Sequence, residues 1–260
     1  MAVRVFLLVF PSALFMPPVV EHVVVSGQFE VIGVGGFAPR KRGSAGAWLR
    51  DQIDYWGLWG SAWIIGATIL RKLPSLLHFP RAFRRLSSVA ETCDALDIPY
   101  ERVADVNDAA FVARLREAGV DVIVSFQQAI FKRELLQAPT IACLNVHTGI
   151  LPGYRGFKPV FWMQSRGEPE MGVTIHVMNE SIDTGRIVAQ RRWRRRDRSS
   201  VLENQLWSYR CAAQCIVEAV ERIAQIAPRP DAEIPDHSPY FKAPTRAERD
   251  HALANGTRLL

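Results

Sequence analysis

The alternation of apolar, strand-like runs with helical segments constrains the fold of this chain most strongly. Residues 3–10 are apolar apart from Arg4, as expected of a strand buried on both faces of a sheet. Further strands are expected at 30–34, 98–103, 120–125, 141–146, 173–178 and 186–192, and helices at 18–26, 108–118, 131–137, 159–166 and 199–226. Because strands and helices alternate, the sequence predicts an α/β fold with a doubly wound, mostly parallel sheet and helices on both faces.

Two segments fall outside this alternation. A helical insertion is expected at about 43–86, and a stretch rich in proline and charge follows the last helix. We therefore predict one α/β domain over 1–226 and an extended C-terminal arm over 227–260, anchored by Tyr240 and Phe241. The first strand is not followed by G-x-G-x-x-G, so the sequence gives no indication of a dinucleotide site.

Three polar residues stand where chemistry is expected in such a sheet. Asn145 and His147 are two apart at the end of a predicted strand, so their side chains point to the same side. Ligands of open α/β sheets bind at the carboxyl ends of strands, and turns bounded by glycine can bring Asp183 back to this end. An amide can hold a carbonyl oxygen as negative charge develops on it, an imidazole can orient groups or shuttle a proton, and a carboxylate can accept one through water. This set suits acyl transfer to an amine.

Each of the three residues also has a simpler explanation when it is taken alone. Asn145 can cap a strand end, His147 can be a hydrogen-bonded core histidine, and Asp183 can stabilise a turn before Thr-Gly. Their occurrence together, in this order, favours a functional site.

The longer sequence around these residues resembles the folate-dependent formyltransferase family, which includes glycinamide ribonucleotide, methionyl-tRNA and amino-sugar formyltransferases. The resemblance covers roughly 120–190 and is carried by the ordered segments 144–147, 151–156, 172–178 and 182–187. It implies the Rossmann-like formyltransferase fold and N10-formyltetrahydrofolate as the formyl donor. It also implies that Asn145, His147 and Asp183 form the catalytic triad.

The resemblance further implies where the folate and the acceptor bind. In the family, the segment after strand 120–125 lies along the pterin, largely through backbone groups, and 179–183 forms a second wall. The folate contacts carried over are Gln128, Ala129, Ile130, Glu180 and Ile182. Arg155 is either a loop-fixing residue or an acceptor contact, and we assign it as the candidate substrate-binding residue. Thr148-Gly149 stands where several family members carry Pro-Ser, so an acceptor contact by that serine is not carried over.

Comparison within the resemblance narrows the acceptor. Glycinamide ribonucleotide enzymes carry a glycine-rich phosphate loop after the first strand, whereas residues 10–18 contain no glycine. Methionyl-tRNA enzymes continue into a β-barrel domain, for which we expect no room here. We therefore predict formyl transfer to a nucleotide-linked amino sugar, with no nucleic-acid partner. The alternatives are another small amine such as hydroxyornithine, a formyltetrahydrofolate hydrolase, and a catalytically silent, membrane-associated binding protein.

Cysteine and charge patterns bound the remaining possibilities. The four cysteines form no C-x-x-C and the six histidines are scattered, so we expect no metal site and a reducing, cytoplasmic compartment. The net charge of +6 is concentrated at 190–198, which is either a solvated strand end or a docking patch for phosphate, nucleic acid or an anionic membrane.

The insertion contains an uncharged, tryptophan-rich segment at 55–70. It is shorter than the about 20 apolar residues of a membrane-spanning helix. Three interpretations stay open. The segment is a buried or homodimer-forming helix, a lid over the acceptor pocket, or an interfacial helix. In the last case residues 55–72 contact a membrane surface, and the protein lies peripherally at the inner membrane face.

Overall fold

The computed structural model describes residues 2–37, 45–80, 84–126, 129–225 and 238–260. Its centre is a seven-stranded sheet with the order β3-β2-β1-β4-β5-β7-β8. The strands are β1 (Arg4–Val9), β2 (Glu30–Phe37), β3 (Tyr100–Val103), β4 (Val122–Ser125), β5 (Ala142–His147), β7 (Glu170–Val177) and β8 (Ile187–Arg194). Neighbouring strands pair in parallel from β3 to β5, whereas β7 runs antiparallel to both of its neighbours, β5 and β8. The predicted α/β fold with a mostly parallel sheet is confirmed.

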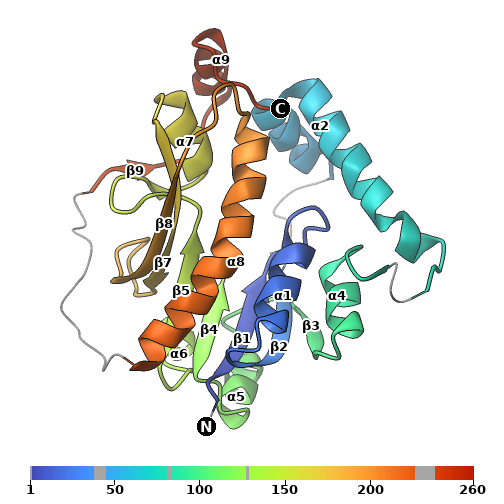
Figure 1. Ribbon diagram of the computed structural model, residues 1–260, viewed down its shortest axis with the longest axis vertical. Helices are drawn as coiled ribbons and strands as arrows, with labels where there is room; N and C mark the ends of the chain where they lie inside the picture. The colour runs from blue at the N-terminus through green and yellow to red at the C-terminus, as the bar shows by residue number, and fades with distance from the viewer. Residues whose placement is uncertain (1, 38–44, 81–83, 127–128, 226–237) are drawn as a thin grey trace.

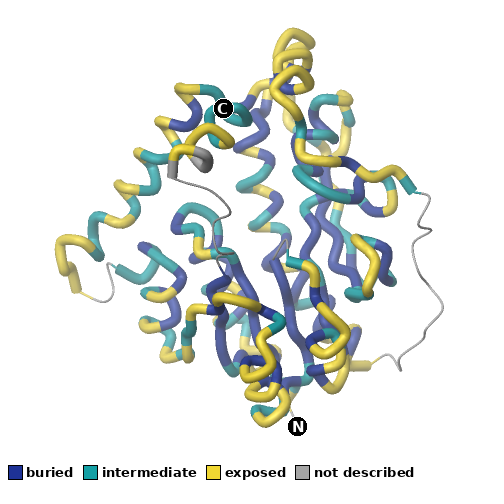
Figure 2. The backbone as a smooth tube through the Cα atoms, turned by 180° about the vertical axis from the view of Figure 1, so that it is seen from behind, coloured by how far each residue is buried: buried dark blue, intermediate teal, exposed yellow. Residues whose placement is uncertain are grey.

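Successive side chains of β1 point to opposite faces of the sheet, so the core has two layers. Val5, Leu7 and Val9 pack with one set of helices, and Phe6 and Leu8 pack with another. The first set is α1 (Met16–Val25), α4 (Val89–Ala95) and α8 (Val201–Gln225), and the second is α5 (Ala109–Glu117) and α6 (Arg133–Leu136). Figure 1 shows α1 and α8 lying across one face of the sheet, and Figure 2 shows the buried strands between the two layers. Because β3, β2, β1, β4 and β5 are parallel, their carboxyl ends lie at the same edge of the sheet.

The C-terminal part differs from the predicted extended arm. β9 (Tyr240–Phe241) pairs with β6 (Arg155–Gly156), and Phe241 is buried whereas Tyr240 is 42% exposed. Residues that follow form the helix α9 (Arg246–Ala254), which the sequence analysis did not anticipate. The Thr245 side chain accepts from the Glu248 amide, and the Glu248 carboxylate accepts from the Thr245 amide, which is a capping box. Residues 227–237 of the predicted arm lie outside the described residues.

The expected helical insertion is α2 (Ala45–Leu76), which has a non-helical break at Gly57, where φ is 73°. Its first part packs through Tyr55 and Trp56 on a cluster that includes Phe161 of α7 (Pro159–Ser165). The second part extends away from the sheet (Figure 1). Within the described ranges, no helix combines the length and apolar character needed to cross a bilayer.

Candidate active site

The two polar residues of β5 face two polar residues of β7. In the antiparallel register Asn145 lies opposite His176, and His147 lies opposite Thr174. Neighbouring positions on both strands, such as Val146 and Ile175, point into the core under α8, so these four side chains share the other face of the sheet. Asn145 Nδ2 is 3.1 Å from His176 Nε2. The strand register alone thus forms a polar cluster at the end of β5.

Asp183 completes this cluster from the loop between β7 and β8. It has a φ of +54°, a left-handed conformation that is uncommon for a non-glycine residue. The Asn179 carboxamide oxygen holds the loop by accepting from the Ser181 amide and the Thr184 hydroxyl. Gly185 is required next to it, because an added Cβ would lie 1.7 Å from the Val177 carbonyl oxygen. This turn directs the Asp183 carboxylate towards β5.

The carboxylate of Asp183 contacts the other members of the predicted triad. Asn145 Nδ2 donates to Oδ1 at 3.3 Å, and the Gly156 amide donates to Oδ2 at 2.8 Å. His147 Nδ1 lies 3.5 Å from Oδ2, and His176 Nε2 lies 3.4 Å from Oδ1. The structure therefore brings Asn145, His147 and Asp183 together, as the sequence predicts, and adds His176.

Hydrogen bonds to backbone carbonyls fix the tautomers of both histidines. His147 Nε2 lies 2.6 Å from the Tyr154 carbonyl oxygen, and His176 Nδ1 lies 2.9 Å from that of Val177. A carbonyl oxygen can only accept, so these two nitrogens carry the hydrogens. His147 Nδ1 and His176 Nε2 are then acceptors in the neutral imidazoles, and both are directed at Asp183 or Asn145.

The protonation states suit a site that receives a proton. Burial lowers the pKa of His147 below its usual range, against the opposing effect of the Asp183 carboxylate. Burial would raise the pKa of Asp183, but His147, His176 and the Gly156 amide outweigh it and hold that pKa at about 2. At neutral pH the pair is therefore a neutral imidazole beside a carboxylate, with acceptor atoms facing each other across 3.5 Å.

Because residue 149 is a glycine without a side chain, the His147 imidazole has room where it lies. A Cβ at residue 149 would lie 2.9 Å from His147 Nε2 and 2.6 Å from the Pro159 Cβ. Thr174 fixes the same loop, because its hydroxyl donates to the Gly149 carbonyl and accepts from the Leu151 amide. The space beside the His147 imidazole is thus too small for a side chain at position 149 unless a neighbour shifts.

The predicted folate contacts lie on two loops beside this cluster. Ile130 is 71% exposed and Ile182 is 45% exposed, Glu180 is also exposed, and Ala129 is half-buried. Asn107 holds the first loop, since its amide nitrogen donates to the Ile130 carbonyl and its oxygen accepts from the Lys132 amide. Gln128 lies outside the described residues.

Arg155 is buried, and its guanidinium donates to backbone carbonyls of two segments. Its Nε and Nη2 donate to the Ile182 carbonyl at 3.1 and 2.8 Å, and Nη1 donates to the Ser238 carbonyl at 3.3 Å. These bonds join the loop of Asp183 to the C-terminal segment. They are the contacts of a loop-fixing residue, and an acceptor contact by Arg155 stays a prediction.

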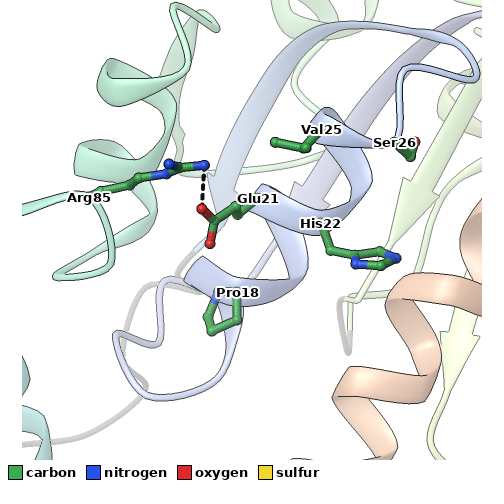
Figure 3. A pocket seen from close by; sticks show the side chains of 6 residues that line it. All are labelled: Pro18, Glu21, His22, Val25, Ser26 and Arg85. Atoms are coloured by element: carbon green, nitrogen blue, oxygen red, sulfur yellow. Dashed lines mark ion pairs between the residues drawn. The ribbon is translucent and has the colours of Figure 1, made fainter. Parts of the chain in front are cut away.

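Two other features lie away from the triad. A cavity of about 370 Å³ beside α1 is crossed by an ion pair between Glu21 and Arg85 (Figure 3), and its lining contains none of the predicted site residues. In the basic run, Arg191 pairs with Glu218, and Arg192 lies 3.9 Å from Glu170. Within the described part of the chain, no group of three or more His, Cys, Asp or Glu side chains could hold a metal ion.

Comparison with known proteins finds similarity to formyltransferases. Residues 84–204 match the family described as Formyl transferase. The chain is 33% identical over 159 residues to a methionyl-tRNA formyltransferase from Pelotomaculum thermopropionicum, which covers 59% of this chain and 50% of that protein. Over residues 84–204 the chain is therefore similar to the formyltransferase family. It spans about half the length of this curated relative.

Solved structures agree with the formyltransferase fold. A glycinamide ribonucleotide transformylase from Symbiobacterium toebii has a TM-score of 0.60 and 13% identity, with 90% of this chain and 93% of that chain covered. A sugar N-formyltransferase from Shewanella sp FDAARGOS_354 has a TM-score of 0.57 and 16% identity, with 96% and 88% covered. At these identities the likeness concerns the fold of the formyltransferase domain.

Proposed function

We propose that this chain is an N-formyltransferase that moves a formyl group from N10-formyltetrahydrofolate to the amine of a nucleotide-linked amino sugar. The observation that carries the proposal is the contact of the Asp183 carboxylate with both Asn145 and His147, at the carboxyl end of β5 in a formyltransferase domain. The three catalytic residues are Asn145, His147 and Asp183.

Asn145 is the group that stabilises negative charge. Its amide nitrogen has two hydrogens, which the 3.1 Å contact with His176 and the 3.3 Å contact with Asp183 engage in the present structure. The longer of these contacts can be exchanged for one with the formyl oxygen. A donor fixed in advance by β5 and β7 stabilises that oxygen as the acceptor amine attacks, with little reorganisation.

His147 and Asp183 receive the proton that the amine loses. His147 Nδ1 and Asp183 Oδ2 are two hydrogen-bond acceptors that face each other. An added proton is therefore best stabilised between these two atoms. Once there, the proton converts two facing acceptors into an ion-paired hydrogen bond. The same imidazolium can pass it on to the departing folate nitrogen.

The described residues fit the folate donor, which supplies the formyl carbon. Ile130 follows β4 and Ile182 precedes Asp183, and both present exposed apolar side chains against which a flat heterocycle can be buried. Backbone groups of 129–131, held by Asn107, can bond to the polar edge of the heterocycle. Gln128, Ala129 and Glu180 complete the proposed folate-binding set.

Lys158 is a candidate to bind the anionic part of a nucleotide-linked acceptor. The family resemblance did not point to this residue. Lys158 precedes Pro159, whose ring lies against Gly149 beside the catalytic imidazole. Its ammonium lies 4.3 Å from the centre of the Tyr55 ring, and burial lowers its pKa. No ion pair joins it to a carboxylate in the described ranges. A phosphate of the acceptor would supply the missing anion, with Arg155 as the second proposed acceptor contact.

The test is tetrahydrofolate release from N10-formyltetrahydrofolate, with and without a panel of nucleotide-linked amino sugars, and with product masses determined. We expect release only with an amine, together with a product that has gained one formyl group. Release without an amine would instead identify a hydrolase. Release only with hydroxyornithine or another non-nucleotide amine would support a formyltransferase but would contradict a nucleotide-linked amino sugar as its acceptor.

Three expectations about the protein remain predictions beside this reaction. They are a cytoplasmic location, a peripheral membrane contact through 55–72, and a homodimer. Fractionation of cells that express the chain tests the first two, since a protein bound at the inner membrane face is released by salt or alkali.

A further inference from the structure

The second part of α2 exposes a continuous apolar face. At helical spacing, residues three and four apart share one side, and from Leu58 onward this side carries only apolar residues. We call it the α2 face, and it consists of Leu58, Trp59, Ala62, Trp63, Gly66, Ile69, Leu70, Leu73, Leu76 and Leu77. Trp59 is 84% exposed and Leu70 is 67% exposed. An exposed apolar stripe of this length is unusual on a monomer.

The residues that the structure describes leave this face uncovered. The opposite side of the helix holds Ser61, which is buried, and Arg71, whose Nε donates to the Leu86 carbonyl at 3.1 Å. Near the end of the helix, the Ser75 hydroxyl donates to Glu91 of α4. These contacts fix how α2 is rotated, so the apolar side is turned outward. Figure 1 shows the helix projecting beyond the sheet.

The area of the α2 face matches what a stable dimer needs. Seven of its members or neighbours, besides Trp59, are large hydrophobic side chains that are 45–67% exposed, namely Leu58, Trp63, Ile69, Leu70, Leu76, Leu77 and Phe79. Since a buried aromatic side chain covers about 150–250 Å², the exposed parts together amount to on the order of 1,000 Å². One partner of a standard interface contributes about 800 Å².

The face is also complementary to itself. Gly66 lies at its middle, and a Cβ added there would meet nothing within 4 Å. An antiparallel pair of α2 helices centred on Gly66 places Trp63 opposite Ile69 and Trp59 opposite Leu73. Small residues then lie at the crossing and bulky ones on both sides of it, which satisfies the requirement that a two-fold interface match its own surface.

The charges beside the face fit a protein partner better than a lipid surface. Interfacial membrane helices carry lysine and arginine along their polar side. Residues 51–70 contain no basic side chain, and they begin with Asp51 and Asp54. Among the described residues that follow, Arg71, Arg84 and Arg85 are held by contacts within the protein, whereas Lys72 is exposed at the edge of the face. An anionic bilayer would gain little from this arrangement.

We propose that the α2 face is a homodimer interface, occupied by the same face of a second copy. The first experiment measures the mass of the full chain in solution by light scattering after gel filtration, at tens of micromolar. Twice the monomer mass of 29.2 kDa is expected for the wild type. The double variant Trp63→Lys, Leu70→Lys should have the monomer mass. The control Val25→Lys changes a 62% exposed residue on α1 and should remain dimeric. A monomeric wild type, or a double variant that stays dimeric, would overturn the proposal.

A second variant keeps the test decisive if the lysine substitutions impair folding. Gly66→Cys should form a disulfide-linked dimer on mild oxidation, because a two-fold axis at this residue brings its two copies within the roughly 4.4–6.8 Å Cα separation of a disulfide. Thr68→Cys, on the opposite side of the helix, should not. If neither variant crosslinks, or if the chain is monomeric and floats with phosphatidylglycerol vesicles through this face, the proposal is wrong.

Discussion

Asn145 and His176 face each other across β5 and β7, with Asn145 Nδ2 3.1 Å from His176 Nε2. The His176 Nδ1 hydrogen is directed at the Val177 carbonyl, so Nε2 accepts from the amide of Asn145. The rotation of the Asn145 carboxamide is therefore set by a residue of the neighbouring strand. In the proposed reaction this makes His176 a positioning residue for the oxyanion donor.

Replacing His176 should lower turnover through Asn145. For His176→Phe we expect kcat to fall roughly tenfold or more, with little change in the KM of the folate, since a preorganised donor acts mainly in the transition state. His176→Gln keeps an acceptor near Asn145 and should recover part of the loss. Steady-state kinetics of both variants provide the test. If both variants lost kcat equally and also lost thermal stability equally, His176 would have a merely structural role.

Gly149→Ser should disturb the imidazole of His147 directly. The new Cβ would meet His147 Nε2 at 2.9 Å and Pro159 at 2.6 Å, so the ring must move away from the Tyr154 carbonyl. Overpacking of this kind costs about 1–3 kcal/mol of unfolding free energy. Urea denaturation and kcat should both show the loss. The control is Gly153→Ser in the same loop, where the nearest atom to an added Cβ is 3.7 Å away, and its properties should stay near those of the wild type.

The low pKa of Asp183 predicts an acid-dependent contribution to stability. Its pKa is about 2 in the folded chain and 3.8 in the absence of the fold, so the unfolded chain binds more protons between these values. The contribution is therefore complete above about pH 4 and is lost as the pH falls through about 2. A shift of this size corresponds to about 2 kcal/mol. The difference in unfolding free energy between wild type and Asp183→Asn should shrink from pH 5 to pH 2, and a constant difference would contradict the assignment.

Lys158 provides a test of the anionic acceptor. Lys158→Gln should raise the KM of a nucleotide-linked amine about tenfold or more, because a charged hydrogen bond is lost, and should leave the KM of the folate unchanged. Lys242→Gln, which changes an exposed lysine, is the matched control. Equal changes in both KM values would show that Lys158 acts on the site as a whole.

The central sheet and the shared direction of Asn145 and His147 were predictable because their signals are local, whereas the addition of Asp183 rested on the family resemblance. Apolar runs such as that of β1 identify strands buried on both faces, and the spacing of Asn145 and His147 places both on one side of β5. The helix α9 was not anticipated, because its capping box at Thr245 and Glu248 lies in a polar segment without a strong apolar stripe. Its stability depends on Arg249, which donates to the Ile53 carbonyl of the distant α2.

The contribution of His176 could not be read from strand spacing alone. Its place opposite Asn145 depends on the antiparallel register of β5 and β7, which is set by the loops between them. Lys158 was missed for a similar reason, since its neighbour Tyr55 belongs to the insertion. The signal that could have found His176 was its place in the segment 172–178, two residues from Thr174 on the same face.

The most direct test of the account is tetrahydrofolate formation by the wild type and by Asn145→Ala, with an amine acceptor in excess. Removing one oxyanion donor should lower kcat by about 10²–10³. The KM of N10-formyltetrahydrofolate should change little, because the lost contact belongs to the transition state. Turnover by Asn145→Ala equal to that of the wild type would contradict the assignment of this cluster as the catalytic site.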